Sequence, residues 1–263
     1  MAKMDGPVIH KILGAFETLF LVEYPDRLLL LDGGCLTDTN QIIYFITKIL
    51  NRKMEDLKLA VVSHAHPDHA GAALKLRKLY KTEIAAHEFI DLWYSGIGGF
   101  TQHLMDIGFA QYVIFKFHHR IKHLWYSRKI NPDHKLRDND PLPYFDDWKV
   151  LHMPGHTAND IVIYNEKLSL AYIGDLIIRM IGIYYPPIPV TNSSAYKKTI
   201  DRLSKMKIDK LLLAHGGVVQ NTDISKVVLS VLPKIKKMGK LNALKPFMRF
   251  NKASRRPRKN TRK

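Results

Sequence analysis

The chain of 263 residues contains a single cysteine, Cys35. One cysteine excludes a disulfide within the chain and leaves no set of thiolates to bind a metal. Cys35 follows two glycines, and we interpret it as a small packed residue rather than a reactive thiol. No stretch of about 18 uninterrupted apolar residues occurs, so no membrane-spanning helix is predicted. The N-terminal residues also lack the apolar core and cleavage site of a signal peptide, and we therefore expect a cytoplasmic protein.

Acidic residues are absent from the C-terminal end of the chain. The formal net charge is +17 at pH 7, and residues 233–263 hold 13 Lys and Arg with no Asp or Glu. Residues 1–232 hold 28 basic and 24 acidic residues and are nearly balanced. We therefore predict a main domain, residues 1–232, and a basic tail, residues 233–263. The tail is expected either to be solvated or to bind an anionic membrane surface or nucleic acid, and the apolar residues Phe247, Met248 and Phe250 within it favour the periphery of a membrane.

The densest group of metal-ligand side chains directly follows the apolar run 59–62. Its pattern is His-x-His-x-Asp-His, formed by His64, His66, Asp68 and His69. A polar surface turn would explain one or two histidines, but four such residues after a buried strand predict a site for a divalent transition metal. On a tight loop alternate residues point to opposite sides. The first two histidines would then serve one ion, and the Asp-His pair would serve a second.

Three later segments each place one further candidate ligand after a predicted strand. These candidates are His156, Asp175 and His215. Glycine adjoins all three, which lets a ligand loop turn sharply and lets backbone approach a metal. Strand ends are also where open α/β sheets build their binding sites.

Taken together, these motifs resemble the metallo-β-lactamase-fold hydrolase superfamily, in particular its lactonase and glyoxalase II-like branch. The resemblance covers residues 9–217 and implies an α/β fold, a four-layer αββα sandwich. Seven residues match the family's metal ligands, and an early aspartate matches the residue that orients a ligand histidine from behind. His64, His66 and His156 would hold one ion, Asp68, His69 and His215 the second, Asp175 would bridge both, and Asp32 would be the orienting aspartate. Zinc is expected, while iron or manganese suits the same ligands.

This resemblance implies a metal-dependent hydrolase in which a hydroxide bridging two metal ions attacks the substrate. Asp68, near the bridging position, is the candidate general acid/base. The apolar run 176–185 favours an ester, lactone or thioester with an apolar acyl part as the small-molecule substrate. Four residues of this run are candidate substrate contacts: Ile178, Arg179, Tyr184 and Tyr185.

Two alternative functions remain open. A phosphodiesterase or nuclease of the same fold would use the same ligands, although the nearly balanced charge of residues 1–232 gives little support for a groove that follows phosphates. A non-catalytic binding module is the second alternative. Such modules usually lose metal ligands, whereas this chain retains all seven.

The long gap between His69 and His156 departs from the compact family pattern. We expect residues 88–130 to form an inserted, largely helical element that covers the mouth of the site and sets specificity. Its aromatic density would otherwise leave an exposed apolar patch, which a homodimer would cover instead. Helical periodicity also predicts helices over residues 71–80 and 223–238.

Overall fold

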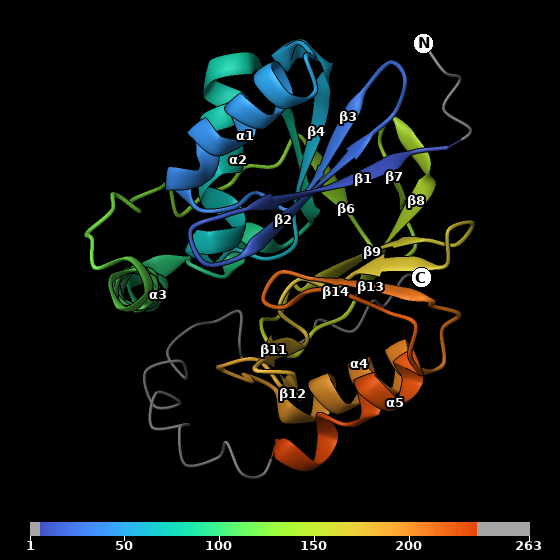
Figure 1. The fold of residues 1–263 in the computed structure, drawn as a ribbon. Helices are drawn as coiled ribbons and strands as arrows, with labels where there is room; N and C mark the ends of the chain where they lie inside the picture. The colour runs from blue at the N-terminus through green and yellow to red at the C-terminus, as the bar shows by residue number, and fades with distance from the viewer. Residues whose placement is uncertain (1–5, 236–263) are drawn as a thin grey trace, which may run out of the picture.

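The computed structural model describes residues 6–235, which form two six-stranded sheets packed face to face (Figure 1). The strand orders are β1-β2-β3-β4-β5-β6 and β14-β13-β10-β9-β8-β7. Apolar side chains from the two facing surfaces form a shared core that includes Phe20, Trp148 and Tyr172. All but the first three residues of the predicted basic tail lie outside the described residues.

The first half of the chain builds the first sheet. Its strands are β1 (Val8–Leu13), β2 (Thr18–Glu23), β3 (Leu28–Leu31), β4 (Leu57–Val62), β5 (Glu83–His87) and β6 (His134–Leu136). Strands β1 to β3 are antiparallel, and β3 to β6 are parallel. All of β3 and most of β4 are buried, as expected for strands that are covered on both faces. Helices α1 (Thr39–Tyr44) and α2 (Pro67–Tyr80) cover the outer face (Figure 1).

The second half builds the second sheet. Its strands are β7 (Pro141–Leu142), β8 (Phe145–His152), β9 (Ile161–Asn165), β10 (Leu170–Tyr172), β13 (Lys210–Leu213) and β14 (Gly217–Gln220). Helices α4 (Ser193–Ser204) and α5 (Ile224–Leu229) pack on its outer face through a second apolar core. Asn192 caps α4 by accepting a hydrogen bond of 3.0 Å from the Ala195 N–H. Two helical layers outside two sheets confirm the predicted αββα sandwich.

Two predicted helices differ from the observed ones at their ends. Helix α2 begins at Pro67, not at Gly71, because proline has the helical φ and lacks only an N–H that the first turn leaves unpaired. The metal-ligand motif is therefore not a loop throughout, since Asp68 and His69 lie on the first turn of α2. The closing helix, predicted over residues 223–238, ends at Leu229, and a short 3-10 helix (Leu232–Lys234) follows at Pro233.

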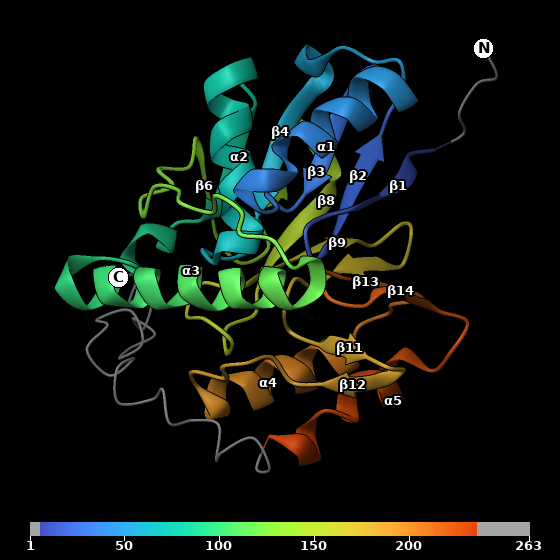
Figure 2. The same ribbon diagram turned by 60° about the vertical axis from the view of Figure 1, so that its left-hand side comes forward.

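Residues 88–130 contain a 3-10 helix (Ile90–Leu92) and the long helix α3 (Gly96–His118). Figure 2 shows α3 crossing the front of the molecule, with the small hairpin of β11 (Ile178–Met180) and β12 (Ile183–Tyr185) below it. Within the part of the chain that the structure describes, no helix has the length and apolar character needed to span a membrane.

Candidate metal centre

All seven predicted metal ligands meet at one edge of the sandwich. They come from the end of β4, the first turn of α2 and the loops after β8, β10 and β13. Their ligand atoms form two groups, and within each group all atoms lie within 4.8 Å of one another. The groups are His64, His66, His156 and Asp175, and Asp68, His69, His215 and Asp175. This is the division into two sites that the sequence predicted.

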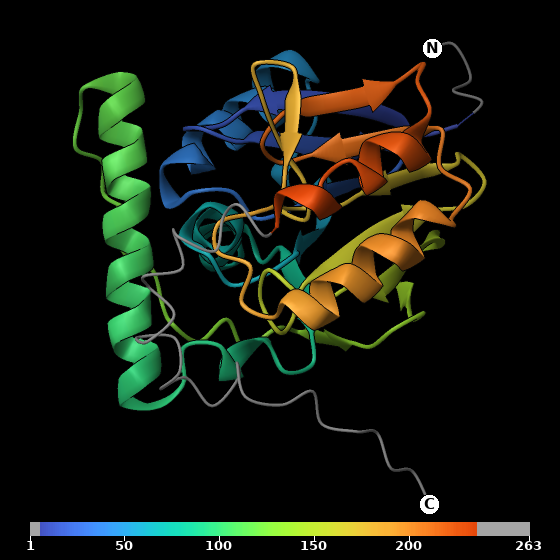
Figure 3. The same ribbon diagram turned by 90° about the horizontal axis from the view of Figure 1, so that it is seen from below.

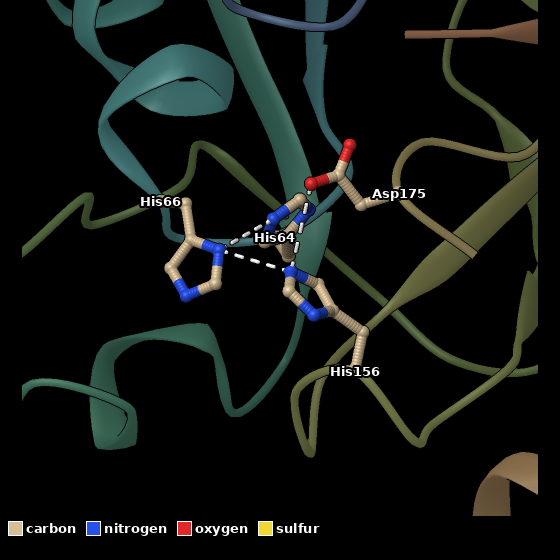
Figure 4. Close-up of side chains that lie close together, drawn as sticks. All are labelled: His64, His66, His156 and Asp175. Carbon is tan, nitrogen blue, oxygen red and sulfur yellow. Dashed lines mark hydrogen bonds and ion pairs between the residues drawn. The ribbon is translucent and has the colours of Figure 1, made fainter. Parts of the chain in front are cut away.

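The first group brings three imidazole nitrogens together (Figure 4). His66 Nδ1 lies 2.9 Å from His64 Nε2 and 3.0 Å from His156 Nε2. Asp175 Oδ2 lies 3.7 Å from His156 Nε2. Three nitrogens that converge on one point, with a carboxylate beside them, are a donor set that zinc and related ions accept.

The second group surrounds the other oxygen of Asp175. Oδ1 of this carboxylate lies 3.2 Å from both His69 Nε2 and His215 Nε2. Asp68 Oδ2 lies 3.3 Å and 3.1 Å from the same two nitrogens. Two buried atoms of this group, His69 Nε2 and Asp175 Oδ1, make no hydrogen bond. Because buried polar atoms normally have a partner, these residues fit a bound cation.

Hydrogen bonds from behind orient the ligand rings. Asp32 Oδ2 lies 2.6 Å from His69 Nδ1 and accepts a hydrogen bond of 2.7 Å from the Tyr172 hydroxyl. His156 Nδ1 donates to the Pro189 carbonyl at 2.7 Å. With Nδ1 hydrogen-bonded in both rings, Nε2 faces the centre and can bind a metal ion once it carries no proton. Asp32 thus occupies the position predicted for the orienting aspartate.

Burial keeps the first group of histidines neutral. It lowers the pKa of His64 well below its usual value, lowers that of His66 to about 4, and also lowers the pKa of His156. Neutral imidazole is the form that binds a metal. The three rings are therefore ready to act as ligands at neutral pH.

The second group is held together by charge. Burial alone would lower the pKa values of His69 and His215, but the carboxylates of Asp68 and Asp175 outweigh it and raise both well above the usual value. Protons on these rings supply the positive charge that the two carboxylates require. A divalent ion would displace them, so metal binding should release protons.

Asp106, on α3, was not predicted from the sequence. Its Oδ2 lies 3.6 Å from His66 Nε2, which makes no hydrogen bond. The Tyr94 hydroxyl donates to Asp106 at 2.7 Å, and burial raises the pKa of this carboxyl to about 6. The Tyr126 hydroxyl donates to the Ala65 carbonyl between the first two ligand histidines. Residues 88–130 therefore contact the ligand loop directly, and no local spacing in the sequence indicates this.

The four candidate substrate residues lie on the β11–β12 hairpin, beside the second group. The Arg179 N–H donates to the His215 carbonyl at 2.7 Å, and its guanidinium lies 5.7 Å from the centre of the Tyr184 ring. The apolar run 176–185, from which the substrate class was inferred, is buried at its start and exposed further on. Leu176 and Ile177 belong to the core under α4 and α5, whereas the tip of the hairpin is exposed. Only the part from Ile178 onward is available to a substrate.

A third cluster of potential ligands, not predicted, lies behind the centre. Glu17, Cys35 and Asp38 are all buried, and the Cys35 N–H donates to both carboxylates at 3.1 Å and 2.8 Å. Burial raises the pKa of the Cys35 thiol well above its usual value, and the nearby carboxylates raise it further. A thiol that stays protonated is a packing group rather than a nucleophile, which agrees with the interpretation from the sequence.

Known proteins share both the sequence pattern and the fold. The Metallo-beta-lactamase superfamily matches residues 15–215. "Probable metallo-hydrolase YqjP" of Bacillus subtilis (strain 168) is 26% identical over 170 residues, which cover 58% of this chain and 50% of that protein. The chain thus matches about half the length of this relative.

Two solved structures support the fold. The metallo-beta-lactamase family protein TTHA1429 from Thermus thermophilus superimposes with a TM-score of 0.64 at 18% identity, covering 92% of this chain and 83% of that one. TTHA1623, solved in a di-iron-bound form, gives a TM-score of 0.58 at 20% identity, covering 87% and 98%. With a family match over most of its length and the ligand geometry described above, the chain belongs to the metallo-β-lactamase superfamily, a family of metal-dependent hydrolases.

Proposed function

We propose that the protein is a dinuclear metal-dependent hydrolase that acts on an ester, lactone or thioester with an apolar acyl part. The observation that carries this proposal is Asp175, whose two oxygens face two separate groups of histidines. When bound there, two divalent ions would activate water at neutral pH and polarise the oxygen of the scissile group. Zinc suits this donor set, and iron or manganese suits it as well.

The protein's own residues supply the other parts of the reaction. Asp68 lies 3.1 Å from His215 Nε2 and 3.3 Å from His69 Nε2, so its carboxylate stands inside the centre. We assign it the transfer of a proton from the attacking water to the leaving group. Arg179 and Tyr184, on the hairpin beside the His215 loop, are placed to orient the substrate.

The metal stoichiometry tests the dinuclear centre. The purified protein, reconstituted with zinc and then freed of excess metal, should hold about two ions per chain by elemental analysis. Asp175→Ala should lose both ions and all turnover, because its carboxylate serves both groups. Asp201→Ala, an exposed aspartate of α4 that pairs with Lys205, is the matched control and should retain both. Saturation of the wild-type protein below one equivalent would contradict the proposal.

A substrate panel tests the reaction class. Esters of increasing acyl length, lactones and thioesters should be hydrolysed, with rates that rise with acyl length and are abolished by a chelator. Bis-p-nitrophenyl phosphate and RNA belong in the same panel. Rapid cleavage of these phosphodiesters with no acyl hydrolysis would replace the proposal with a phosphodiesterase. Full metal loading without turnover of any substrate would favour a binding module.

A further inference from the structure

Large apolar side chains are concentrated on one part of the surface. Of the 22 large apolar residues exposed among the described residues, 12 fall in the two short segments 97–125 and 180–188. Scattered exposed apolar residues are ordinary, but a concentration of this kind marks a surface that contacts an apolar partner.

Helix α3 is apolar on two opposite sides. On the inner side, Ala110 and Ile114 are buried in a cluster with Cys35. On the outer side, five exposed residues are separated by three, four, eight and three positions, which matches one stripe along an α-helix. They are Ile97, Phe100, Leu104, Tyr112 and Phe115. A helix with an apolar periphery normally has neighbours all round, yet Figure 3 shows α3 along one side of the molecule, away from α4 and α5.

Two further elements extend this surface. The segment after α3 exposes Ile121 and Trp125. The β11–β12 turn exposes Met180 and Ile183 and leaves Ile181 fully exposed. Figures 1 and 2 place the hairpin on the same side of the molecule as α3. The outer stripe of α3, residues 119–129 and the β11–β12 turn are together called the α3 face.

The charges around the α3 face are of one sign. Residues 107–132 hold five Lys and Arg and residues 176–192 hold one, Arg179, with no Asp or Glu in either segment. Some of these cations lie directly over the apolar stripe. Lys116 Nζ is 5.7 Å from the centre of the Tyr112 ring, and the Arg128 guanidinium is 5.1 Å from that of Phe100. Apolar and basic groups are thus interleaved rather than segregated.

We propose that the α3 face docks onto an anionic lipid bilayer. Exposed apolar side chains enter the boundary between headgroups and acyl chains, while interleaved cations pair with lipid phosphates and carboxylates. Other occupants fit the charge less well. Residues 236–263 carry no acidic residue, and a second copy would bring the same basic face against the first. Nucleic acid offers the complementary charge but no apolar layer for Ile97, Ile121 and Ile181.

Docking would orient the candidate metal centre toward the lipid. Asp106 of α3 contacts His66, and Arg179 of the hairpin donates to the His215 carbonyl, so the two main parts of the α3 face flank the centre. If the proposed hydrolase function is right, on which this step rests, its acyl substrate enters from the membrane surface as an amphiphile.

Vesicle flotation of the full chain tests the docking without reference to turnover. Phosphatidylcholine vesicles with about one-third phosphatidylserine should carry the protein, and pure phosphatidylcholine vesicles should carry much less. The triple variant Ile97→Ser/Ile121→Ser/Ile181→Ser should bind the anionic vesicles at least about tenfold more weakly. The matched control Ile49→Ser/Leu79→Ser/Leu168→Ser removes three exposed apolar residues from other surfaces and should bind like the wild type. Unchanged metal content shows that each variant is folded.

Three results would overturn the proposal. The first is unchanged vesicle binding by the triple variant. If deletion of residues 240–263 then abolishes binding, the tail and not the α3 face binds the vesicles. The second is a wild-type protein that does not bind vesicles and sediments as a dimer, while the triple variant is monomeric. A second copy of the chain would then cover the α3 face. The third is retention by RNA without any binding to vesicles. None of these results bears on the metal centre, which the stoichiometry tests separately.

Discussion

At the scale of single residues, Asp106 links helix α3 to the candidate metal centre. His66 directs Nδ1 toward His64 and His156, so its Nε2 is the atom that a neighbour can hold, and Asp106 Oδ2 lies 3.6 Å away. A carboxylate behind a ligand histidine fixes the ring and raises its basicity. We predict that Asp106→Asn weakens metal binding at the first site about 10- to 100-fold and leaves the second site unchanged. A chelator-competition titration that resolves the two sites measures this.

The control for this prediction is Tyr94→Phe, which removes the 2.7 Å hydrogen bond to Asp106 and keeps the carboxylate. It should affect the first site less than Asp106→Asn does. Asp106→Glu, which keeps the charge, should restore part of the affinity. An equal loss at both sites, together with a lower melting temperature, would mean that Asp106 only supports the packing of α3.

At the scale of elements, a histidine pair joins the two sheets. His87 ends β5, His152 ends β8, and their ring centres lie 4.2 Å apart. Burial, with a smaller contribution from the neighbouring His152, lowers the pKa of His87 to about 3. In the unfolded chain the usual pKa is about 6.5, so the unfolded state binds the proton first as pH falls. We predict that His87 leaves the free energy of unfolding unchanged well above pH 6.5 and lowers it by about 2 kcal/mol at pH 5.

Urea unfolding of the metal-free protein at pH 7.5 and pH 5 checks this. His87→Asn should flatten the pH dependence, because asparagine does not titrate. Its amide oxygen can still accept the Phe89 N–H that His87 Nδ1 accepts at 3.2 Å, so the local hydrogen bond is kept. Other buried histidines should maintain part of the dependence of the free energy of unfolding on pH. The same slope in wild type and variant would show that His87 does not contribute.

At the scale of the whole molecule, the basic tail should be separable from catalysis. Every ligand of the candidate metal centre precedes Gly217, and both sheets are complete by Gln220. Deletion of residues 240–263 should therefore leave metal content unchanged and turnover of a soluble substrate within about twofold. Loss of either would place the tail in the catalytic domain. Its proposed contribution is additional attraction to anionic lipid, so the deletion should make vesicle binding more sensitive to salt.

The sequence by itself determined the sandwich, which the family resemblance implied, and the seven residues of the candidate centre. The motifs behind both are local patterns. Apolar runs mark buried strands, and His64, Asp175 and His215 each follow such a run, so the sheet edge brings them together once the strands pair. There were two local errors. The start of α2 was misplaced because Pro67 was read as part of a loop when it is the first residue of the helix, and the closing helix was extended past Leu229 although Pro233 follows.

Only the tertiary structure decided how α3 is used. Its sequence is apolar on two opposite sides, so periodicity does not distinguish the stripe that packs inward from the stripe that stays outside. Asp106 faces His66 and Ile97 faces solvent because of where the rest of the chain lies, not because of their neighbours in sequence. Similarly, Leu176 became core and Ile181 became surface within one apolar run, since burial depends on contacts with distant elements.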